Sequence, residues 1–330
     1  MTWLVTGGAG YIGSHVLAVL RERGIPAVAY DDLSTGRSER VRDTTLIRGD
    51  IADARTLGEA LRRHAVRGVV HLAAKKDAAE SVRRPLDYYR ENVEGTRRLL
   101  EAMADASVDR LVFSSSAAVY GGVHDEPVDE SAFCSPANPY GWTKLIGEQL
   151  IADVAAATGL RWACLRYFNV SGARSDLEAD LKSPSLISAA MRAVLAGERP
   201  VILGDDYPTP DGTCVRDYVH VADLADAHGA AVEALESGEV SGLTVNVGTG
   251  RGYSVQEVLR VVRSVAGADD SDTTLPLVAP RRPGDVARSL AAVDRIAAEL
   301  GWRATRDLED MVRSTFDSMR RAGAVGATDA

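Results

Sequence analysis

Short apolar runs alternate with segments of helical periodicity through the first half of the chain. The runs, each typical of a strand, are residues 3–6, 27–30, 45–48, 68–73, 110–115 and 161–168. Between them, apolar residues recur with the period of a helix near residues 12–23, 53–64, 86–106 and 140–157. This alternation predicts a doubly wound parallel sheet with right-handed crossovers and helices on both faces.

The pattern changes after residue 169. Residues 171–185 and 204–218 are polar and rich in turn-forming residues, and helical periodicity returns near residues 186–197, 222–236, 254–265, 291–300 and 306–320. We therefore expect an α/β chain in two parts. Residues 1–168 would form a Rossmann domain, and residues 169–330 a smaller C-terminal α/β lobe, from which some segments return to the first domain.

Composition and charge limit the possible partners. The 330 residues include 38 basic and 47 acidic side chains, which gives a net charge of −9. Nucleic acid and anionic membranes need a basic protein face, so neither is expected as the main partner. The three cysteines form no CxxC pair, and no apolar run reaches membrane-spanning length. These features favour a reducing, cytoplasmic location and no metal site.

A glycine motif, VTGGAGYIGSH, follows the first predicted strand. Gly8, Gly10 and Gly13 satisfy G-x-G-x-x-G. Gly7 with the latter two also satisfies G-x-x-G-x-x-G. Glycine allows a tight turn, a close approach to a pyrophosphate and close packing of the next helix on the strand. A predicted strand before the motif and a predicted helix after it are the context that indicates a dinucleotide.

Asp31 ends the second predicted strand, 18 residues after Gly13. A carboxylate there accepts hydrogen bonds from a ribose diol and repels a 2′-phosphate. The expected cofactor is therefore NAD rather than NADP.

Tyr140 and Lys144 are four residues apart in a predicted helix and share one face. A tyrosine with an ordinary pKa of about 10 is a poor base at neutral pH. A lysine ammonium one turn away, together with the positive nicotinamide of NAD, would favour the phenolate. Such a tyrosine could take a proton from a substrate hydroxyl as a hydride leaves the carbon. Ser116 ends the fifth predicted strand, where a doubly wound sheet binds ligands, and could relay that proton.

These residues resemble the extended short-chain dehydrogenase/reductases. Within that group, YIGSH, DDLSTG, RGDI, ESVRRPLDYYREN, RYFNVSGA, GDDYPTPDGTCVRDYVHVADLADAH and APRRPGD are similar to the UDP-glucose 4-epimerase family, over about residues 2–315. The resemblance implies a nucleotide-sugar 4-epimerase with tightly bound NAD, interconverting UDP-glucose and UDP-galactose through a 4-keto intermediate. It also implies a homodimer formed through helices 86–106 and 140–157.

The resemblance implies roles for individual residues. Tyr140 would be the base, Lys144 would bind the nicotinamide ribose, and Ser116 would assist proton transfer. The other residues expected to hold the cofactor are Gly7, Gly10, Tyr11, Ile12, Asp31, Ser34, Thr35, Asp50, Ile51, Lys76 and Asn92. Besides Ser116 and Tyr140, the residues expected to hold the substrate are Asn169, Arg216, Arg282, Asp285 and Ser289. Arg216 and Arg282 would pair with the diphosphate, because guanidinium forks suit phosphate oxygens.

Related reactions need side chains that this chain lacks. Nucleotide-sugar 4,6-dehydratases resemble a version with Asp-Glu directly after the hydroxyl residue, and nucleotide-glucuronate decarboxylases one with Glu at the second position. Here these positions are Ala117 and Ala118, and alanine cannot move a proton. A non-catalytic NAD-binding sensor could dispense with Tyr140 and Lys144, which are both present.

The second half departs from the UDP-glucose 4-epimerase pattern. SPSLIS, residues 183–188, stands where that family commonly has an Asn-Asn-Leu stretch, Leu203 where it often has an aromatic residue, and Asp77 where it usually has a small or apolar one. Ser289 falls where the family has either a tyrosine or a small residue, and a small residue leaves room for an N-acetyl group at carbon 2. Epimerisation of UDP-N-acetylglucosamine or of a specialised-metabolite sugar nucleotide therefore stays open.

Overall fold

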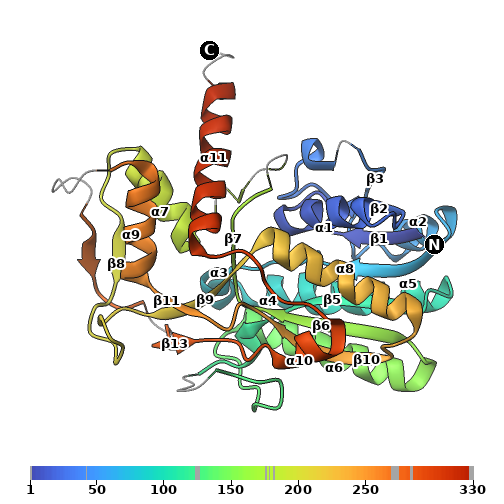
Figure 1. The fold of residues 1–330 in the computed structure, drawn as a ribbon. Helices are drawn as coiled ribbons and strands as arrows, with labels where there is room; N and C mark the ends of the chain where they lie inside the picture. The colour runs from blue at the N-terminus through green and yellow to red at the C-terminus, as the bar shows by residue number, and fades with distance from the viewer. Residues whose placement is uncertain are drawn as a thin grey trace.

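A seven-stranded parallel sheet forms the centre of the molecule (Figure 1). The computed structural model describes residues 2–41, 43–122, 127–174, 177, 179–180, 183–268, 275–282 and 285–326. The strands are β1 (Thr2–Thr6), β2 (Ala27–Asp31), β3 (Leu46–Arg48), β4 (Val66–His71), β5 (Arg110–Ser116), β6 (Arg161–Tyr167) and β10 (Gly242–Val247). Their order is β10-β6-β5-β4-β1-β2-β3. The first six strands follow the Rossmann order, and the predicted doubly wound fold is confirmed.

Alternate residues of the central strands pack against different helical layers. Trp3 and Val5 contribute to one core and Leu4 to the other, because successive side chains of a strand point to opposite faces. One layer contains α1 (Tyr11–Glu22), α8 (Val221–Ser237) and α10 (Asp294–Leu300), and the other α2 (Ala54–Arg63), α5 (Gly95–Asp105) and α6 (Pro139–Thr158). Both faces of the sheet are buried, which explains the continuous apolar runs.

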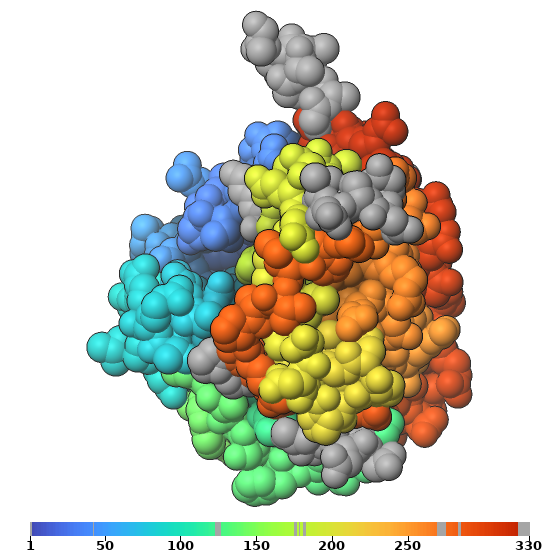
Figure 2. All heavy atoms as spheres, turned by 90° about the vertical axis from the view of Figure 1, so that its left-hand side faces the viewer, coloured from blue at the N-terminus to red at the C-terminus, as the bar shows by residue number. Residues whose placement is uncertain are grey.

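A smaller lobe lies beyond the carboxyl ends of the central strands (Figure 1). One of its sheets contains β7 (Asn169–Ser171), β9 (Val215–His220), β11 (Gly252–Ser254) and β13 (Arg288–Ser289), and the other pairs β8 (Val201–Leu203) with β12 (Leu277–Ala279). Helices α7 (Leu186–Leu195), α9 (Val255–Ala266) and α11 (Leu308–Gly326) share an apolar core with β9. Figure 2 shows this lobe covering one end of the molecule.

Part of the second half returns to the Rossmann sheet, as β10 and α8. β10 pairs in parallel with β6, from Gly242 beside Trp162 to Val247 beside Tyr167. The sequence analysis did not predict this strand, because polar residues interrupt its apolar run. Asn246 is nevertheless fully buried, and its amide donates a hydrogen bond of 2.7 Å to the Val128 carbonyl.

The helix predicted over residues 86–106 forms in consecutive pieces. They are α4 (Pro85–Tyr88), a π-helical segment η2 (Tyr89–Glu94) and α5, and the short helix α3 (Ala78–Arg83) precedes them. A π-helical segment of this kind often marks a functional position. None of the helices in the described part of the chain combines the length and apolar character needed to cross a membrane.

Candidate functional site

The glycine loop joins β1 to α1 at the carboxyl edge of the sheet. Gly7 has a positive φ of 67°, which favours glycine. A side chain on Gly13 would overlap the Gly7 carbonyl oxygen, so glycine there lets α1 pack directly on the loop. Gly10 is the N-cap of α1 and provides no side-chain cap. The N–H groups of the first helical turn, from Tyr11 and Ile12 onward, lack intrahelical partners and can hold a pyrophosphate.

Asp31 is tied to the same loop. Its Oδ2 accepts a hydrogen bond of 3.0 Å from the Ala9 amide, and its Oδ1 accepts one of 2.8 Å from the Leu33 amide. Burial raises the pKa of Asp31, and these two amides oppose that shift. A Cβ on Gly36 would lie 2.6 Å from Oδ1, so this glycine leaves space beside the carboxylate. The neighbouring Ser34 hydroxyl donates to Asp32 at 2.7 Å, and Thr35 is exposed.

The predicted adenine-side residues follow β3. The Gly49 amide donates to the Asp31 carbonyl at 3.1 Å, which brings this segment beside the end of β2. Asp50 accepts the Ala52 amide at 2.8 Å, and Ile51 is buried. Asp50 and Ile51 therefore lie at the same carboxyl edge of the sheet as Asp31.

Three predicted cofactor residues have protein partners for their side chains. The Tyr11 hydroxyl donates to the Gly172 carbonyl at 2.7 Å, and the Lys76 ammonium lies 2.6 Å from the Asp180 carboxylate. The buried Asn92 amide donates to the Lys75 carbonyl and to the Thr143 hydroxyl, both at 2.9 Å. Tyr11 and Lys76 thus connect the Rossmann part to the segment around residues 172–180, and Asn92 connects η2 to α6.

Tyr140 and Ser116 meet at the start of α6. The side chain of Asn138 caps this helix by accepting the Gly141 amide at 2.9 Å, and Pro139 occupies its first turn. Tyr140 is buried. Burial raises the pKa of its phenol, and a hydrogen bond with Ser116 lowers it. The further lowering expected from Lys144 and the positive nicotinamide stays a prediction.

Lys144 is buried one turn further along α6. Its Nζ donates to the Ser114 carbonyl at 2.8 Å and lies 5.0 Å from the centre of the Phe113 ring. Burial lowers the pKa of Lys144 to about 8, and the carboxylate of Glu148 opposes that shift. The predicted proton-transfer residues Ser116, Tyr140 and Lys144 are thus assembled by one strand end and one helix.

Tyr167 is a further side chain at this point, which the sequence analysis did not single out. It ends β6 opposite Ser116 of β5. Burial raises its pKa, and the neighbouring Tyr140 raises it further. Asn169 follows two residues later and is exposed at the start of β7. Asn169 is therefore two residues along the chain from Tyr167, which pairs with Ser116 across the sheet.

The other predicted substrate residues gather around β9. Ser289 of β13 pairs with Arg216. The Asp285 carboxylate lies 3.8 Å from Arg216 Nη2 and 3.4 Å from Arg282 Nε. Asn169 pairs with Tyr218, two residues after Arg216 in β9. Arg216, Arg282 and Asp285 thus form one polar cluster with two guanidinium groups.

Comparisons with known proteins show the family to which this chain belongs. Residues 3–248 match the NAD dependent epimerase/dehydratase family. The chain belongs to this family. A UDP-glucose 4-epimerase from Azospirillum brasilense is 47% identical over 98% of this chain and 96% of its own length.

Solved structures of epimerases have the same fold. The structure of UDP-glucose 4-epimerase from Brucella ovis in complex with NAD has a TM-score of 0.90 at 41% identity, over 96% of this chain and 97% of that one. That of UDP-glucose-4-epimerase from Stenotrophomonas maltophila, with bound NAD and formylated UDP-arabinopyranose, has a TM-score of 0.91 at 39% identity, over 98% and 99%. The predicted family and its cofactor NAD are confirmed.

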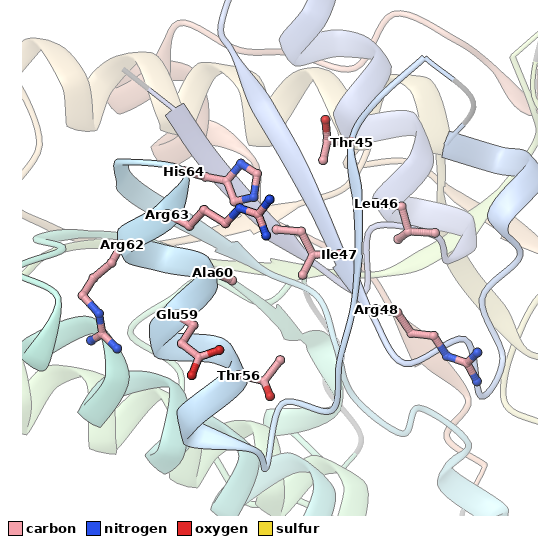
Figure 3. A pocket seen from close by; sticks show the side chains of 10 residues that line it. All are labelled: Thr45, Leu46, Ile47, Arg48, Thr56, Glu59, Ala60, Arg62, Arg63 and His64. Carbon is pink, nitrogen blue, oxygen red and sulfur yellow. The ribbon is translucent and has the colours of Figure 1, made fainter.

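A hollow of about 730 Å³ lies away from the predicted site, between the edge strand β3 and α2 (Figure 3). Its lining residues are Thr45, Leu46, Ile47, Arg48, Thr56, Glu59, Ala60, Arg62, Arg63 and His64. It contains none of the residues that the sequence analysis assigned to the epimerase site.

Two buried carboxylates, Asp217 and Glu148, lie next to predicted site residues and were not predicted from the sequence. Asp217 accepts hydrogen bonds from the amides of Thr249 at 2.8 Å and Gly250 at 2.9 Å, and so fixes the turn after β10 to β9. Glu148 lies one turn beyond Lys144 on the same face of α6. Glu148 repeats the four-residue spacing of Tyr140 and Lys144, and this repeat in the sequence indicates a third side chain on the same helix face.

Proposed function

We propose that this chain is an NAD-dependent nucleotide-sugar 4-epimerase that interconverts UDP-glucose and UDP-galactose. The observation that carries the proposal is the buried Tyr140, hydrogen-bonded with Ser116 and one helical turn from Lys144, at the edge of the sheet where the glycine loop lies. Ala117 and Ala118 follow Ser116 and offer no group for eliminating water. The similarity to UDP-glucose 4-epimerases over nearly the full chain supports the same reaction.

NAD would be held between the glycine loop and the ends of the next two strands. The helix N-terminus after Gly10 would accept the pyrophosphate, and Asp31 would accept the hydroxyls of the adenosine ribose. The close packing of Gly13 on Gly7 supports this fit, since it brings the N-terminus of α1 directly against the loop backbone. Ser34, Thr35, Asp50 and Ile51 would border the adenosine, and Lys76 and Asn92 would lie further along the cofactor.

Proton transfer would be the task of Tyr140. Its phenolate oxygen would accept the proton of the sugar 4-hydroxyl and later return it to the same oxygen, with the Ser116 hydroxyl hydrogen-bonded to both. Lys144 would hold the nicotinamide ribose and stabilise the phenolate. Bound NAD would supply a reversible hydride acceptor for carbon 4 of the sugar.

The cluster around β9 would anchor the nucleotide of the substrate. Arg216 and Arg282 would meet the diphosphate, and Asp285 would hold their side chains or accept a nucleoside hydroxyl. Asn169, beside the proton-transfer residues, would contact the same part of the ligand. The sugar would then remain free to turn over while its diphosphate stays bound.

The decisive experiment incubates the purified protein with a panel of nucleotide sugars and follows the products by NMR. Formation of UDP-galactose from UDP-glucose supports the proposal. Turnover of a different nucleotide sugar alone would retain the mechanism and change the substrate. NAD binding without turnover of any sugar in the panel would favour the sensor and contradict the proposal.

We also propose that the site accepts an N-acetylhexosamine, because the small Ser289 stands next to Arg216 in the sheet. Replacing Ser289 by tyrosine is expected to reduce turnover of UDP-N-acetylglucosamine at least tenfold more than that of UDP-glucose, since it fills the space beside carbon 2. The matched control is Ser289→Ala, which keeps the residue small and should keep both activities. Equal losses for both sugars in the tyrosine variant would contradict the assignment.

A homodimer is proposed from an exposed apolar surface, which we call the helix patch: Val82, Leu86, Tyr89 and Trp142, exposed by 63%, 82%, 36% and 43%. These residues come from α3, α4, η2 and α6, which pack against one another. A patch on adjacent helices is typical of a protein interface. Leu86, Tyr89 and Trp142 lie within the two helices, 86–106 and 140–157, through which the resemblance implies a dimer.

A cytoplasmic location is proposed from the three free thiols, Cys134, Cys164 and Cys214.

A further inference from the structure

Glu148 continues the row of functional side chains along α6. Tyr140, Lys144 and Glu148 are spaced by four residues, so they lie on one face of the helix. All three are buried, although carboxylate and ammonium groups are rarely buried unless paired. The proposed mechanism gives a role to the first two and none to the third.

Three consecutive serines of β5 contact this row, through two hydroxyls and one backbone carbonyl. Ser116 is hydrogen-bonded with Tyr140, and the Ser114 carbonyl accepts from Lys144. The hydroxyl of Ser115 donates to Glu148 Oε1 at 2.5 Å. The strand end therefore holds all three helical side chains at once.

A buried arginine fixes the other side of the Glu148 carboxylate. Arg166 Nη2 lies 2.6 Å from Oε2, and its Nε donates to Oε1 at 2.9 Å. Arg166 Nη1 also donates to the Tyr120 hydroxyl at 3.1 Å, and that hydroxyl donates to Asn246 at 2.7 Å. The carboxylate is thus placed by strands β5 and β6 through bonds that leave it little freedom.

We propose that Glu148 is a positioning residue for Lys144, keeping its buried ammonium charged and directed toward the cofactor side of the site. The inference rests on the proposed epimerase reaction, in which Lys144 must be charged. Arg166 and Ser115 act by holding Glu148.

The other groups that act on Lys144 supply no negative charge. Burial lowers the pKa of Lys144 to about 8, and Glu148 and then Cys164 oppose this. Burial raises the pKa of the Cys164 thiol well above its usual range, so the thiol is neutral at working pH. On β4, burial and then Lys144 lower the pKa of His71 to about 3, so this ring is neutral too. Among the described groups that act on Lys144 electrostatically, the Glu148 carboxylate is the anion.

The test compares the pH dependence of kcat in Glu148→Gln and Glu148→Asp. The glutamine variant removes the charge, so Lys144 loses its proton at a lower pH. We expect the alkaline limb of the profile to move to lower pH by about one unit. The ratio of kcat at pH 8.5 to kcat at pH 6.5 should therefore be roughly tenfold lower in this variant than in the wild type. The aspartate variant keeps the charge and should restore most of the wild-type profile. Asp153→Asn, which removes an exposed carboxylate from the same helix, is the matched control and should leave the profile unchanged.

A second readout follows tyrosinate absorbance against pH in the NAD-loaded and NAD-free protein, with Tyr140→Phe as the background. In Glu148→Gln the Tyr140 phenolate should form at higher pH, because Lys144 is neutral there. A merely structural role would lower stability or kcat uniformly and leave both pH dependences in place, which would overturn the inference.

Glu148→Gln leaves the Arg166 charge buried without its partner, so the double variant Glu148→Gln/Arg166→Gln is included. It should show the same alkaline shift, and a wild-type profile in this folded double variant would overturn the inference. Absence of wild-type epimerisation at every pH would instead contradict the proposed function.

Discussion

At the scale of single residues, two effects act in opposite directions on the pKa of the Tyr140 phenol. Burial raises the pKa of Tyr140, while its hydrogen bond with Ser116 lowers it. A proton acceptor at neutral pH therefore needs positive charge beside it, which Lys144 and bound NAD would supply. In the proposed reaction, Tyr140 would therefore become a competent base when the cofactor is in place.

Removing the Tyr140 hydroxyl tests this directly. Tyr140→Phe keeps the ring but cannot take a proton, so kcat for the nucleotide sugar should fall by about 100-fold or more while the NAD content stays at the wild-type level. Steady-state kinetics and cofactor extraction measure the two quantities. Tyr89→Phe, which removes the hydroxyl of an exposed tyrosine, is the control. Normal turnover in Tyr140→Phe would remove the tyrosine from the mechanism.

Residues that act through a local motif were predictable from the sequence. Asp31, Tyr140 and Lys144 follow from spacing and from strand or helix ends. The structure places Asp31 at the end of β2 beside the glycine loop, and Tyr140 and Lys144 one turn apart on α6. Tyr167 and Arg166 were not predictable in the same way, because their neighbours come from strand pairing and not from sequence distance. Their relation to Tyr140 and Glu148 exists only after β5 and β6 lie side by side.

At the scale of elements, the junction of β1 with α1 depends on a helix that lies unusually close to the preceding loop. Gly13 lies inside α1, where glycine is otherwise unfavourable relative to alanine. Its close contact with Gly7 explains why glycine is used. The geometry of the dinucleotide loop and the stability of the domain are therefore linked at this contact.

Gly13→Ala should damage both properties together. The added methyl group overlaps the Gly7 carbonyl, so we expect a loss of about 1–3 kcal/mol in the free energy of unfolding and a lower content of bound NAD. Thermal unfolding and cofactor extraction measure the effects. Gly122→Ala is the control, because no atom lies within 4 Å of its added carbon. Unchanged NAD content in Gly13→Ala would show that the loop tolerates a displaced helix.

Helices and strands were predictable from the sequence where a single apolar pattern covers the whole element. The six Rossmann strands of the first half follow from their apolar runs. β10 was missed because Thr244 and Asn246 interrupt its run, although β6 and the segment around Val128 bury or bond these polar groups. The pairings among β7, β9 and β13 depend on contacts across the whole second half, which periodicity does not encode.

At the scale of the whole molecule, the helix patch makes association testable. Leu86→Arg places a charge at its most exposed residue, so we expect a proposed dimer to dissociate into monomers. Sedimentation velocity or light scattering measures the change. Leu195→Arg on α7, which charges an exposed leucine outside the patch, should leave the assembly unchanged. A dimer that survives Leu86→Arg would locate the interface elsewhere.

Acid stability is a second property of the whole molecule. Burial lowers the pKa values of His15, His220 and His228 to about 4 and that of His71 to about 3. An unfolded histidine titrates near 6.5, so below that pH the unfolded chain binds more protons than the folded one. The free energy of unfolding should therefore be highest above pH 6.5 and decrease as the pH falls toward 4, by at most about 5 kcal/mol per pH unit for four such groups.

Urea unfolding at several pH values and constant ionic strength measures this decline. His228→Gln should reduce its slope, since one buried titrating group is gone. His64→Gln, which replaces a partly exposed histidine, is the control and should leave the slope nearly unchanged. A pH-independent free energy of unfolding between pH 7 and pH 5 would contradict the role of the buried histidines.

One backbone feature limits how the molecule can move during turnover. Phe168 alone separates β6 from β7, and its amide donates to the Val247 carbonyl at 3.2 Å. β7 of the smaller lobe therefore continues directly from the sheet that carries Ser116, without a hinge at this connection. In the proposed reaction, the separation between the substrate diphosphate and Tyr140 would then stay nearly constant, and the large rearrangement would fall to the torsions of the ligand itself.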